Sequence, residues 1–296
     1  VPEVSVGPVA SNQEDQIVNS PQISVVIPVG SIDELLIEQF DALARQDFSG
    51  PWEAIAALNT ADPDAQAALE KCCDRYEFLR WVDAHEVRSA SYARNVGAGS
   101  SSADLLAFCD GDDLCAPGWL TAMVAGLAEH SVVGGFLDEE LLCPPKQRNW
   151  RPPATPGVLP TFLGSSYIVS ANLGIRREVF EEAGGFTMNL TRGEDMAFGF
   201  ELERLGYELA YLPEAVVYYR HRAGLADMLR QHYLYGIGMS EIVSRGMIPN
   251  DHQRSSGLGA LKPNAQPVPN KSTVQVLRRG AIAVGRVVGL IAARRR

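Results

Sequence analysis

From residue 23 to residue 137 the chain alternates between short apolar runs and longer stretches of helical periodicity. The run Ile23–Val29 is rich in β-branched residues and has the length of a buried strand. Between residues 32 and 46, apolar side chains recur at helical spacing, with Asp33 and Glu34 in the expected first turn. This alternation implies parallel strands joined by right-handed helical crossovers, and therefore an α/β fold with helices on both faces of a mostly parallel sheet.

The pattern predicts strands at residues 23–29, 52–58, 77–82, 105–109, 131–137, 167–171, 209–212 and 215–219. It predicts helices at residues 32–46, 62–75, 89–100, 117–130, 176–183, 193–205 and 223–245, the last interrupted by Gly236 and Gly238. Ligands of such sheets bind beyond the carboxyl ends of the strands, so polar residues at those ends are candidates for a site.

Charge is distributed unevenly along the 296 residues, whose formal net charge is −10. Residues 271–296 hold seven basic side chains and no acidic one, so residues 1–270, with 19 basic and 36 acidic side chains, carry −17. An acidic body argues against nucleic acid as its partner and suits anions that a metal ion neutralises. Five cysteines without a C-x-x-C pair indicate free thiols in a reducing cytoplasm. The sequence has no run of 18 apolar residues, and residues 1–22 form a polar extension without a signal-peptide pattern.

Three carboxylates follow the fourth predicted strand, in the order Asp110-Gly111-Asp112-Asp113. Carboxylates this close repel one another unless a positive charge joins them, and oxygen ligands on a tight turn suit Mg²⁺ or Mn²⁺. Asp110 and Asp112 are therefore the predicted metal ligands. The alternative is a solvated acidic turn in which Asp113 caps the next helix.

Other charged side chains extend this candidate site. Arg88 and Arg94 can reach a diphosphate or orient a carboxylate, or else form surface ion pairs. Glu194 and Asp195 open a helix, where a carboxylate can act as a general base or simply favour the helix dipole. His221, at the end of a strand, is a candidate metal ligand or diphosphate contact, and a hydrogen-bonded structural histidine is the alternative.

The segment 143–160 holds six prolines together with Trp150 and Arg151. A loop this long in a compact domain is a lid, a binding loop or a disordered segment.

Five segments occur in the order found in family 2 of the inverting, nucleotide-sugar-dependent glycosyltransferases, which the chain resembles over residues 23–245. They are Ile23–Pro28, similar to the opening strand; Ala93–Gly97, similar to A-R-N-x-G; Asp110–Asp113, similar to the D-x-D metal motif; 171–186, similar to the acceptor-side segment; and Gly193–Asp195, similar to the E-D catalytic motif. The resemblance implies the GT-A fold, a Rossmann-like, mostly parallel sheet flanked by helices, here with a C-terminal helical extension. It divides residues 23–245 into a nucleotide-sugar half, 23–137, and an acceptor half, 138–245. Composition and periodicity predict a linker at 246–270 and a basic amphipathic tail at 271–296.

The resemblance also implies a role for each candidate residue. Asp195, with Glu194 beside it, would take the proton of an acceptor hydroxyl as that hydroxyl attacks the anomeric carbon with inversion. Asn172 and Trp150 would contact the acceptor, and Mn²⁺ or Mg²⁺ would be held by Asp110, Asp112 and His221. The residues expected to contact the nucleotide-sugar donor are Pro28, Val29, Asn59, Asp62, Arg88, Arg94, Asp110 and Gly111.

The second strand departs from the family pattern. Asn59, with Asp62 nearby, stands where the family has an aspartate-containing turn that holds the nucleotide base. Asn59 keeps hydrogen bonding to a base edge but loses the charge. A UDP-sugar is the expected donor, with guanosine or deoxythymidine nucleotides as alternatives.

The tail has a helical pattern of its own. Within residues 272–293 apolar side chains recur at three- and four-residue spacing, and Arg279 and Arg286 repeat at seven. A basic amphipathic stretch suits an anionic membrane surface, which would fit a lipid-linked or cell-envelope glycan acceptor and a cytoplasmic enzyme held peripherally at the inner face of the plasma membrane. The alternative is a helix docked on the protein's own acidic body.

Two other functions fit the same architecture. A non-catalytic sugar-nucleotide-binding or scaffold protein is favoured by the altered turn at Asn59 and opposed by the retained D-x-D and E-D motifs. A nucleotidyltransferase shares acidic metal sites, but it needs a glycine-rich basic loop after the first strand, and Val29-Gly30-Ser31 is not such a loop.

Overall fold

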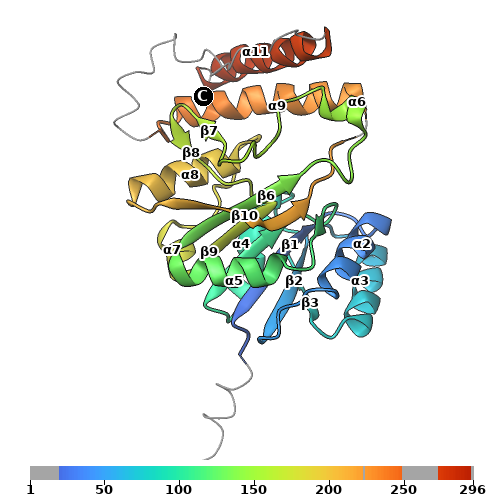
Figure 1. The fold of residues 1–296 in the computed structure, drawn as a ribbon. Helices are drawn as coiled ribbons and strands as arrows, with labels where there is room; N and C mark the ends of the chain where they lie inside the picture. The colour runs from blue at the N-terminus through green and yellow to red at the C-terminus, as the bar shows by residue number, and fades with distance from the viewer. Residues whose placement is uncertain (1–19, 223, 249–272, 295–296) are drawn as a thin grey trace, which may run out of the picture.

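The structure, a computed structural model, describes residues 20–222, 224–248 and 273–294. At its centre is an eight-stranded sheet of order β3-β2-β1-β4-β9-β6-β10-β5 (Figure 1). The sheet comprises β1 (Ile23–Val29), β2 (Trp52–Leu58), β3 (Leu79–Asp83), β4 (Leu105–Cys109), β5 (Leu114–Cys115), β6 (Val132–Asp138), β9 (Asn172–Arg176) and β10 (Leu209–Tyr218). A separate two-stranded sheet pairs β7 (Thr161–Phe162) with β8 (Ser165–Ser166).

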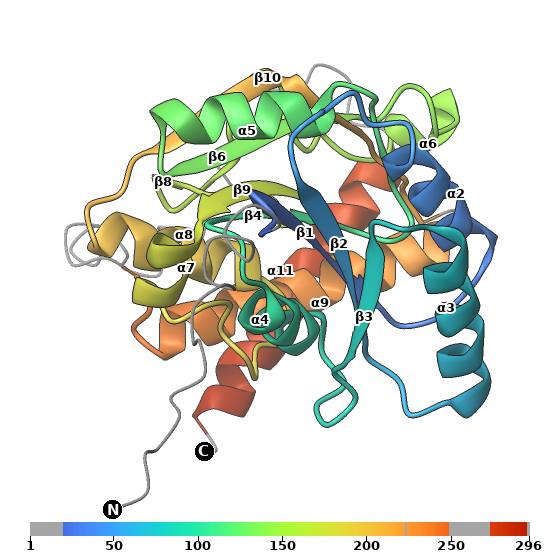
Figure 2. The same ribbon diagram turned by 90° about the horizontal axis from the view of Figure 1, so that it is seen from below.

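Helices cover both faces of the sheet, as the sequence predicts. They are α2 (Glu34–Leu43), α3 (Pro63–Arg75), α4 (Ala90–Ser100), α5 (Trp119–Glu129), α6 (Pro145–Arg148), α7 (Arg177–Glu182), α8 (Glu194–Arg204), α9 (Leu225–Ser244) and α11 (Thr273–Ala293). Alternate side chains of β1 enter opposite cores: Val25 and Ile27 pack with α2, α3 and α5, whereas Val26 packs with α4, α7 and α8. Figure 2 shows α5 and α4 on the two faces.

The strand pairing explains two errors of the sequence prediction. β3, β2, β1 and β4 are parallel, but β9 runs antiparallel to both of its neighbours, β4 and β6. The strand predicted at 167–171 is wrong, because the pairing residues are the five that follow, Asn172–Arg176. The two short strands predicted at 209–212 and 215–219 are one strand, β10, whose register along β6 shifts between Leu212 and Val216.

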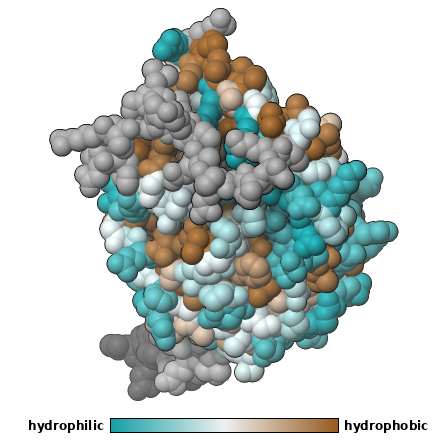
Figure 3. All heavy atoms as spheres, turned by 45° about the horizontal axis from the view of Figure 1, so that its top comes forward, coloured by the Kyte–Doolittle hydropathy of each residue, from teal (hydrophilic) through white to brown (hydrophobic). Residues whose placement is uncertain are grey.

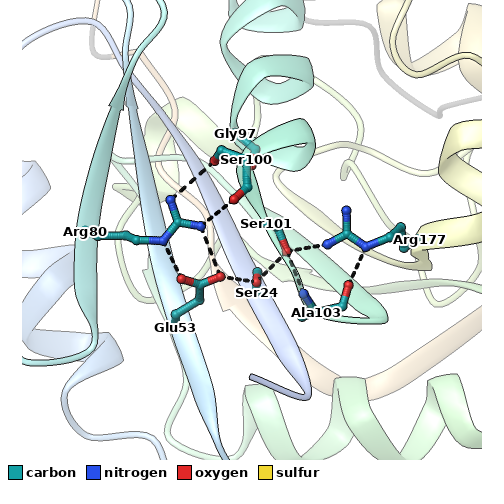
Figure 4. Close-up of polar contacts among 8 residues, drawn as sticks. All are labelled: Ser24, Glu53, Arg80, Gly97, Ser100, Ser101, Ala103 and Arg177. Atoms are coloured by element: carbon teal, nitrogen blue, oxygen red, sulfur yellow. Dashed lines mark hydrogen bonds and ion pairs between the residues drawn. The ribbon is translucent and has the colours of Figure 1, made fainter. Parts of the chain in front are cut away.

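A chain of polar contacts joins elements at the amino ends of the strands (Figure 4). Arg80 of β3 pairs with Glu53 of β2, and Glu53 Oε1 accepts from Ser24 Oγ of β1 at 2.7 Å. Ser101 Oγ donates to Ser24 Oγ at 2.7 Å and accepts from Arg177 Nη2 at 2.6 Å. These polar groups satisfy one another, so this end of the sheet is tied together internally.

Helices α9 and α11 lie side by side beyond the opposite end of the sheet, at the top of Figure 1. Glycines allow the close approach: a Cβ on Gly285 would lie 2.0 Å from Tyr233 O, and one on Gly236 would lie 2.2 Å from Ile282 O. The predicted interruption of α9 at its glycines is therefore wrong, because Gly236 serves packing within a continuous helix. The tail is docked on the protein, the arrangement that the sequence left as an alternative.

The outer face of α11 is apolar and exposed. Its exposed large side chains are Val276, Leu277, Val284, Val287, Val288 and Ile291. Hydrophobic residues gather over this helix at the top of Figure 3. Within the part of the chain that the structure describes, α11 and the other helices are too short or too polar to cross a bilayer. Most of the predicted polar extension and linker, at 1–19 and 249–270, lies outside the described residues.

Candidate active site

The turn that follows β4 brings three aspartates together. One carboxylate oxygen from each of Asp110, Asp112 and Asp113 lies within 4.8 Å of the other two. Asp113 Oδ1 accepts the backbone N–H of Arg220 at 2.7 Å, whereas Asp113 Oδ2 is buried and has no hydrogen-bond partner among the described residues. Burial raises the pKa of Asp113 well above its ordinary value, and the charges of Asp110 and Asp112 raise it further. A buried, unpartnered carboxylate oxygen among three carboxylates fits a divalent cation.

The aspartate turn is fixed from two sides. Arg220 Nε donates to Asp112 O and Arg220 Nη2 donates to Glu38 Oε2, both at 2.9 Å. β5 then pairs with the end of β10, with Leu114 opposite Tyr218. Gly111 leaves room within the turn, because a Cβ there would lie 2.9 Å from the Leu36 side chain. The sequence analysis predicts Asp110 and Asp112, with His221, as ligands and considers Asp113 as a helix cap. The position of Asp113 in the same turn is the signal that makes it a further candidate.

Arg94, on α4, lies between the aspartate turn and α8. Its Nη2 donates to Asp110 Oδ1 at 2.5 Å, and its Nη1 lies 3.7 Å from Glu194 Oε1. The side chain is almost fully buried, and burial alone would lower the pKa of Arg94. The charges of Asp110, Asp195 and Glu194 outweigh burial, so the pKa of Arg94 is raised. These contacts fit the predicted role of Arg94 in orienting a carboxylate, and its burial does not fit a surface ion pair. The predicted diphosphate contact stays a prediction.

Asp195 stands in the first turn of α8. Gly193 caps the helix with a φ of 94°, a left-handed conformation that favours glycine. Asp195 Oδ1 accepts the backbone N–H of Ser170 at 3.3 Å. Burial raises the pKa of Asp195 to about 7, and the charge of Glu194 adds to the rise, while Arg94 and Ser170 oppose it. A carboxyl group with this pKa exchanges its proton near neutral pH, as a general base must.

The carboxyl ends of β1 and β2 lie side by side, because Asn59 N–H donates to Val29 O at 2.7 Å. The Asn59 side chain donates through Nδ2 to Val87 O at 2.8 Å and also to Ala84 O. Both N–H groups are therefore used by the chain itself, and only the Oδ1 acceptor can serve a ligand.

The other predicted donor-binding residues surround this corner. Pro28 is half-buried at the end of β1, and Arg88 is exposed in the loop before α4. Asp62 caps α3, its Oδ1 accepting Asp64 N–H at 3.0 Å. These residues lie at one edge of the sheet, but no described contact joins Asp62 or Arg88 to the aspartate turn.

His221 lies outside the aspartate cluster. Its Nδ1 is 3.0 Å from Arg151 Nη1, and its Nε2 is 3.3 Å from Glu139 Oε1. Both ring nitrogens thus face other side chains, and the three-carboxylate group found among the described residues does not include His221. The predicted metal-ligand role does not fit this placement, whereas the structural alternative does.

Asn172, a predicted acceptor residue, is built into the sheet. It is 1% exposed. Its Oδ1 accepts from Trp119 Nε1 at 2.8 Å, and its Nδ2 donates to Phe136 O at 3.0 Å and to Ala215 O at 2.9 Å. With its donors used and its oxygen occupied, Asn172 cannot bind an acceptor without breaking these bonds. Trp150 is half-buried just after α6.

Two family models match the chain. One is described as glycosyl transferase family 2 and matches residues 24–184; the other is described as glycosyl transferase family group 2 and matches residues 159–282. Glycosyltransferase AglE of Haloferax volcanii is 24% identical over 228 residues, which cover 75% of this chain and 74% of that protein. A pre-mycofactocin glycosyltransferase of Mycobacterium tuberculosis is 27% identical over 157 residues, which cover 49% of this chain and 33% of that protein.

Solved structures share the fold. Mannosyltransferase PcManGT from Pyrobaculum calidifontis, in complex with GDP-Man and Mn²⁺, superposes with a TM-score of 0.60 at 18% identity, covering 93% of this chain and 75% of that one. TarS of S. aureus, in complex with UDP-GlcNAc, gives a TM-score of 0.53 at 18% identity, covering 91% and 83%. At this identity the likeness establishes the architecture expected from the sequence, and nothing about ligands.

Proposed function

The chain belongs to glycosyl transferase family 2, and from that premise we propose that it transfers a sugar from a nucleotide-sugar donor to an acceptor hydroxyl, in a single displacement that inverts the anomeric carbon. The observation that carries the proposal is the position of Arg94. It contacts Asp110 of the aspartate turn and lies 3.7 Å from Glu194, the neighbour of Asp195. The candidate metal ligands and the candidate base therefore share one electrostatic site.

Asp195 is the proposed base. The backbone N–H of Ser170 holds one oxygen of its carboxylate. As the acceptor oxygen attacks the anomeric carbon, Asp195 takes the hydroxyl proton, and the bond between that carbon and the diphosphate oxygen breaks. A single base suffices for one inverting displacement, because no enzyme nucleophile has to be regenerated.

Asp110, Asp112 and Asp113 would hold Mn²⁺ or Mg²⁺. The unpartnered Asp113 Oδ2 and the spacing of the three carboxylates support this assignment. A divalent cation bound there would supply positive charge that favours departure of the diphosphate. The complex of PcManGT with Mn²⁺ is consistent with such a site in a protein of the same fold.

The donor would lie over the carboxyl ends of β1 and β2, with its base near Pro28, Asn59 and Asp62. The adjacency of Val29 and Asn59 supports this placement. A UDP-sugar is our expected donor. The structurally similar proteins bind GDP-Man in one case and UDP-GlcNAc in the other, so both nucleotides belong in a test panel.

We place the outer face of α11 on an anionic membrane surface, which would present a lipid-linked or cell-envelope acceptor. Six large apolar side chains are exposed on this face, and Arg294 is exposed at its end, before Arg295 and Arg296 in the sequence. Val284→Glu/Val288→Glu should stop pelleting with phosphatidylserine-containing vesicles, while Met188→Glu, on an exposed loop residue, should not. Equal pelleting of both variants, or none by the wild type, would remove the membrane role.

Release of nucleoside diphosphate tests the enzymatic proposal. UDP-, GDP- and dTDP-sugars are incubated with Mn²⁺, with candidate acceptors present or absent. Asp195→Asn keeps the shape of the side chain but cannot accept the proton, so it should bind nucleoside diphosphate with unchanged affinity and lose transfer. Transfer by this variant at the wild-type rate would remove Asp195 from the base role. Absence of nucleoside diphosphate binding by the wild-type protein would contradict the assignment of a nucleotide-sugar donor.

A further inference from the structure

Two arginines distant in sequence lie close enough for the charge of Arg151 to act on Arg278. Arg151 lies in the loop after α6, and Arg278 lies in the second turn of α11. The two segments touch, because Gln275 Nε2 donates to the carbonyl oxygen of Asn149 at 3.2 Å. Arg278 is one helical turn beyond Gln275, on the same side of α11, and Arg151 is two residues beyond Asn149.

Both guanidinium groups contain buried N–H groups without partners among the described residues. Arg151 is 8% exposed. Its Nη1 faces His221 Nδ1 at 3.0 Å, but its Nε and Nη2 make no hydrogen bond. Arg278 Nε is likewise buried and unpartnered. Burying such donors costs free energy unless the acceptor oxygens of a ligand form hydrogen bonds with them.

The positive charges of this arginine cluster are only partly balanced by acidic groups. Burial lowers the pKa of Arg278, and the neighbouring charges of Arg279 and Arg151 lower it further. Burial also lowers the pKa of His232 on α9, to about 4. A hydrogen bond to Met228 O opposes this shift, whereas the charges of Arg278 and Arg151 lower the pKa further. The histidine is therefore neutral, and the two arginines carry the charge.

The acid that faces the cluster is already engaged. Glu139 Oε1 accepts the backbone N–H of Ala154 at 2.8 Å and lies 3.3 Å from His221 Nε2. It offsets part of the charge of Arg151, but no hydrogen bond joins the two side chains. Glu139 supplies one negative charge near Arg151, so the two guanidinium groups together keep a net positive charge.

Tyr235 connects the cluster with the surroundings of Asp195. The rings of His232 and Tyr235 lie 5.6 Å apart between centroids. Burial raises the pKa of Tyr235, and the charges of Asp195 and Glu194 raise it further. Tyr235 also acts on the pKa of Arg151, so this phenol lies within electrostatic range of both the proposed base and the arginine cluster. The donor side, at β1 and β2, is formed by other elements.

We propose that Arg151 and Arg278 bind a phosphate group of the acceptor, so that the acceptor substrate is a phosphorylated molecule. This inference rests on the proposed function, because it assigns the charge of the molecule whose hydroxyl is glycosylated. Two guanidinium forks suit a doubly charged phosphate better than a singly charged carboxylate. A lipid phosphate and a soluble phosphate ester share this chemistry, and the test separates them.

The full chain is titrated with two probes in the presence of EDTA. Binding of inorganic phosphate is measured by thermal shift. Binding to phosphatidylcholine vesicles, with or without phosphatidic acid, is measured by co-sedimentation. EDTA removes phosphate binding through a cation at the aspartate turn. The variants are Arg151→Gln and Arg278→Gln, with Arg279→Gln as the matched control that removes the same charge from the next position of α11. Unfolding without ligand is recorded for each, and we expect both test variants to be at least as stable as the wild type, because each loses buried unpaired donors.

Each test variant should weaken phosphate binding at least about tenfold, whereas Arg279→Gln should change it by no more than about twofold. A loss with both probes assigns the site to the phosphate group itself, and a loss with vesicles alone assigns it to a lipid phosphate. Unchanged binding of both probes in the two test variants, or binding of neither probe by the wild type, overturns the proposal.

Binding of UDP and GDP with Mn²⁺ is measured in the same proteins. We expect it to be unchanged in all three variants. A parallel loss of nucleotide binding in Arg151→Gln would show that the arginines bind the donor, and it would overturn their assignment to the acceptor. Absence of nucleotide binding in the wild type would instead refute the proposed function, independently of the phosphate result.

Discussion

The guanidinium of Arg94 donates to the carboxylate of Asp110 at 2.5 Å from a position that is almost fully buried. Helix α4 is thereby joined to the turn that follows β4. The same guanidinium lies 3.7 Å from Glu194 on α8, so one side chain spans the two groups of carboxylates that the proposed reaction requires. Buried charges of this kind are costly to leave unpaired, which makes each of them a sensitive point for mutation.

Arg94→Gln should reduce kcat about a hundredfold or more, because it removes the positive charge that organises Asp110 and Glu194. The same change should raise the pKa of Asp195, since Arg94 lowers it. Rates of nucleoside diphosphate release across pH measure both effects. Arg75→Gln, which breaks an exposed ion pair with Asp41, is the control and should leave the profile unchanged. If Arg94→Gln lowers the rate of nucleoside diphosphate release but does not shift the pH profile upward, the electrostatic role of Arg94 is contradicted.

The pH dependence of kcat/KM should follow Asp195. Its pKa is raised to about 7, and only the deprotonated carboxylate accepts a proton. Activity should therefore be full above pH ~8 and fall about tenfold for each pH unit below ~6. Initial rates at fixed ionic strength provide the measurement, and an activity that stays constant down to pH ~5 would exclude Asp195 as the base.

Asp195→Asn should stabilise the fold at alkaline pH. The folded-state pKa of Asp195 lies above its unfolded value, so the stabilisation from the protonated carboxyl is lost as the pH rises through about 7. The amide carries no charge to desolvate, so the variant should melt roughly 5 °C above the wild type at pH ~8, and the difference should shrink towards pH ~5. Differential scanning calorimetry at several pH values decides this, and a pH-independent difference would show that the charge of Asp195 is not the cause.

Asp113→Asn should abolish most of the stabilisation by Mn²⁺ while leaving the metal-free protein folded. The asparagine oxygen can still accept the N–H of Arg220, which Asp113 binds at 2.7 Å, but the charged ligand oxygen is gone. The repulsion from Asp110 and Asp112 also disappears, so the metal-free variant should be the more stable of the two. Melting curves with Mn²⁺ and with EDTA give both results; an undiminished Mn²⁺ shift would exclude Asp113 as a ligand.

Gly285→Ala should loosen α11 from α9. Its Cβ would lie 2.0 Å from Tyr233 O, so the helices must separate, at a cost of about 1–3 kcal/mol. Gly280→Ala, on the same helix with nothing within 4 Å of its Cβ, is the matched control and should stabilise the protein by about 0.5–1 kcal/mol. Denaturant unfolding compares the two, and equal effects would show that the close approach contributes nothing.

Local sequence accounts for much of the fold. The sequence predicts β1, β2 and β4 to the residue, because each is a mainly apolar run that pairs on both sides. β9 was missed, since Asn172 and Gly174 interrupt its apolar pattern and its position depends on antiparallel pairing with strands far away in sequence.

The residues that form the candidate site could largely be predicted from the sequence, but many of their contacts could not. The aspartate turn and the first turn of α8 could be located from their place after a strand and before a helix. The contacts of Asn59, Asn172 and His221 could not, because their partners, such as Val87, Phe136 and Arg151, come from other segments. The predicted domain boundaries remain predictions.

The Ser24–Glu53–Arg80 contacts, continued through Ser101 to Arg177, hold the strand starts without help from any residue of the site. Architecture and chemistry are thus encoded at opposite poles of the molecule. Natural variation or laboratory libraries can diversify the loops at the reactive pole, and so explore new donors and acceptors, while the scaffold beneath them stays intact.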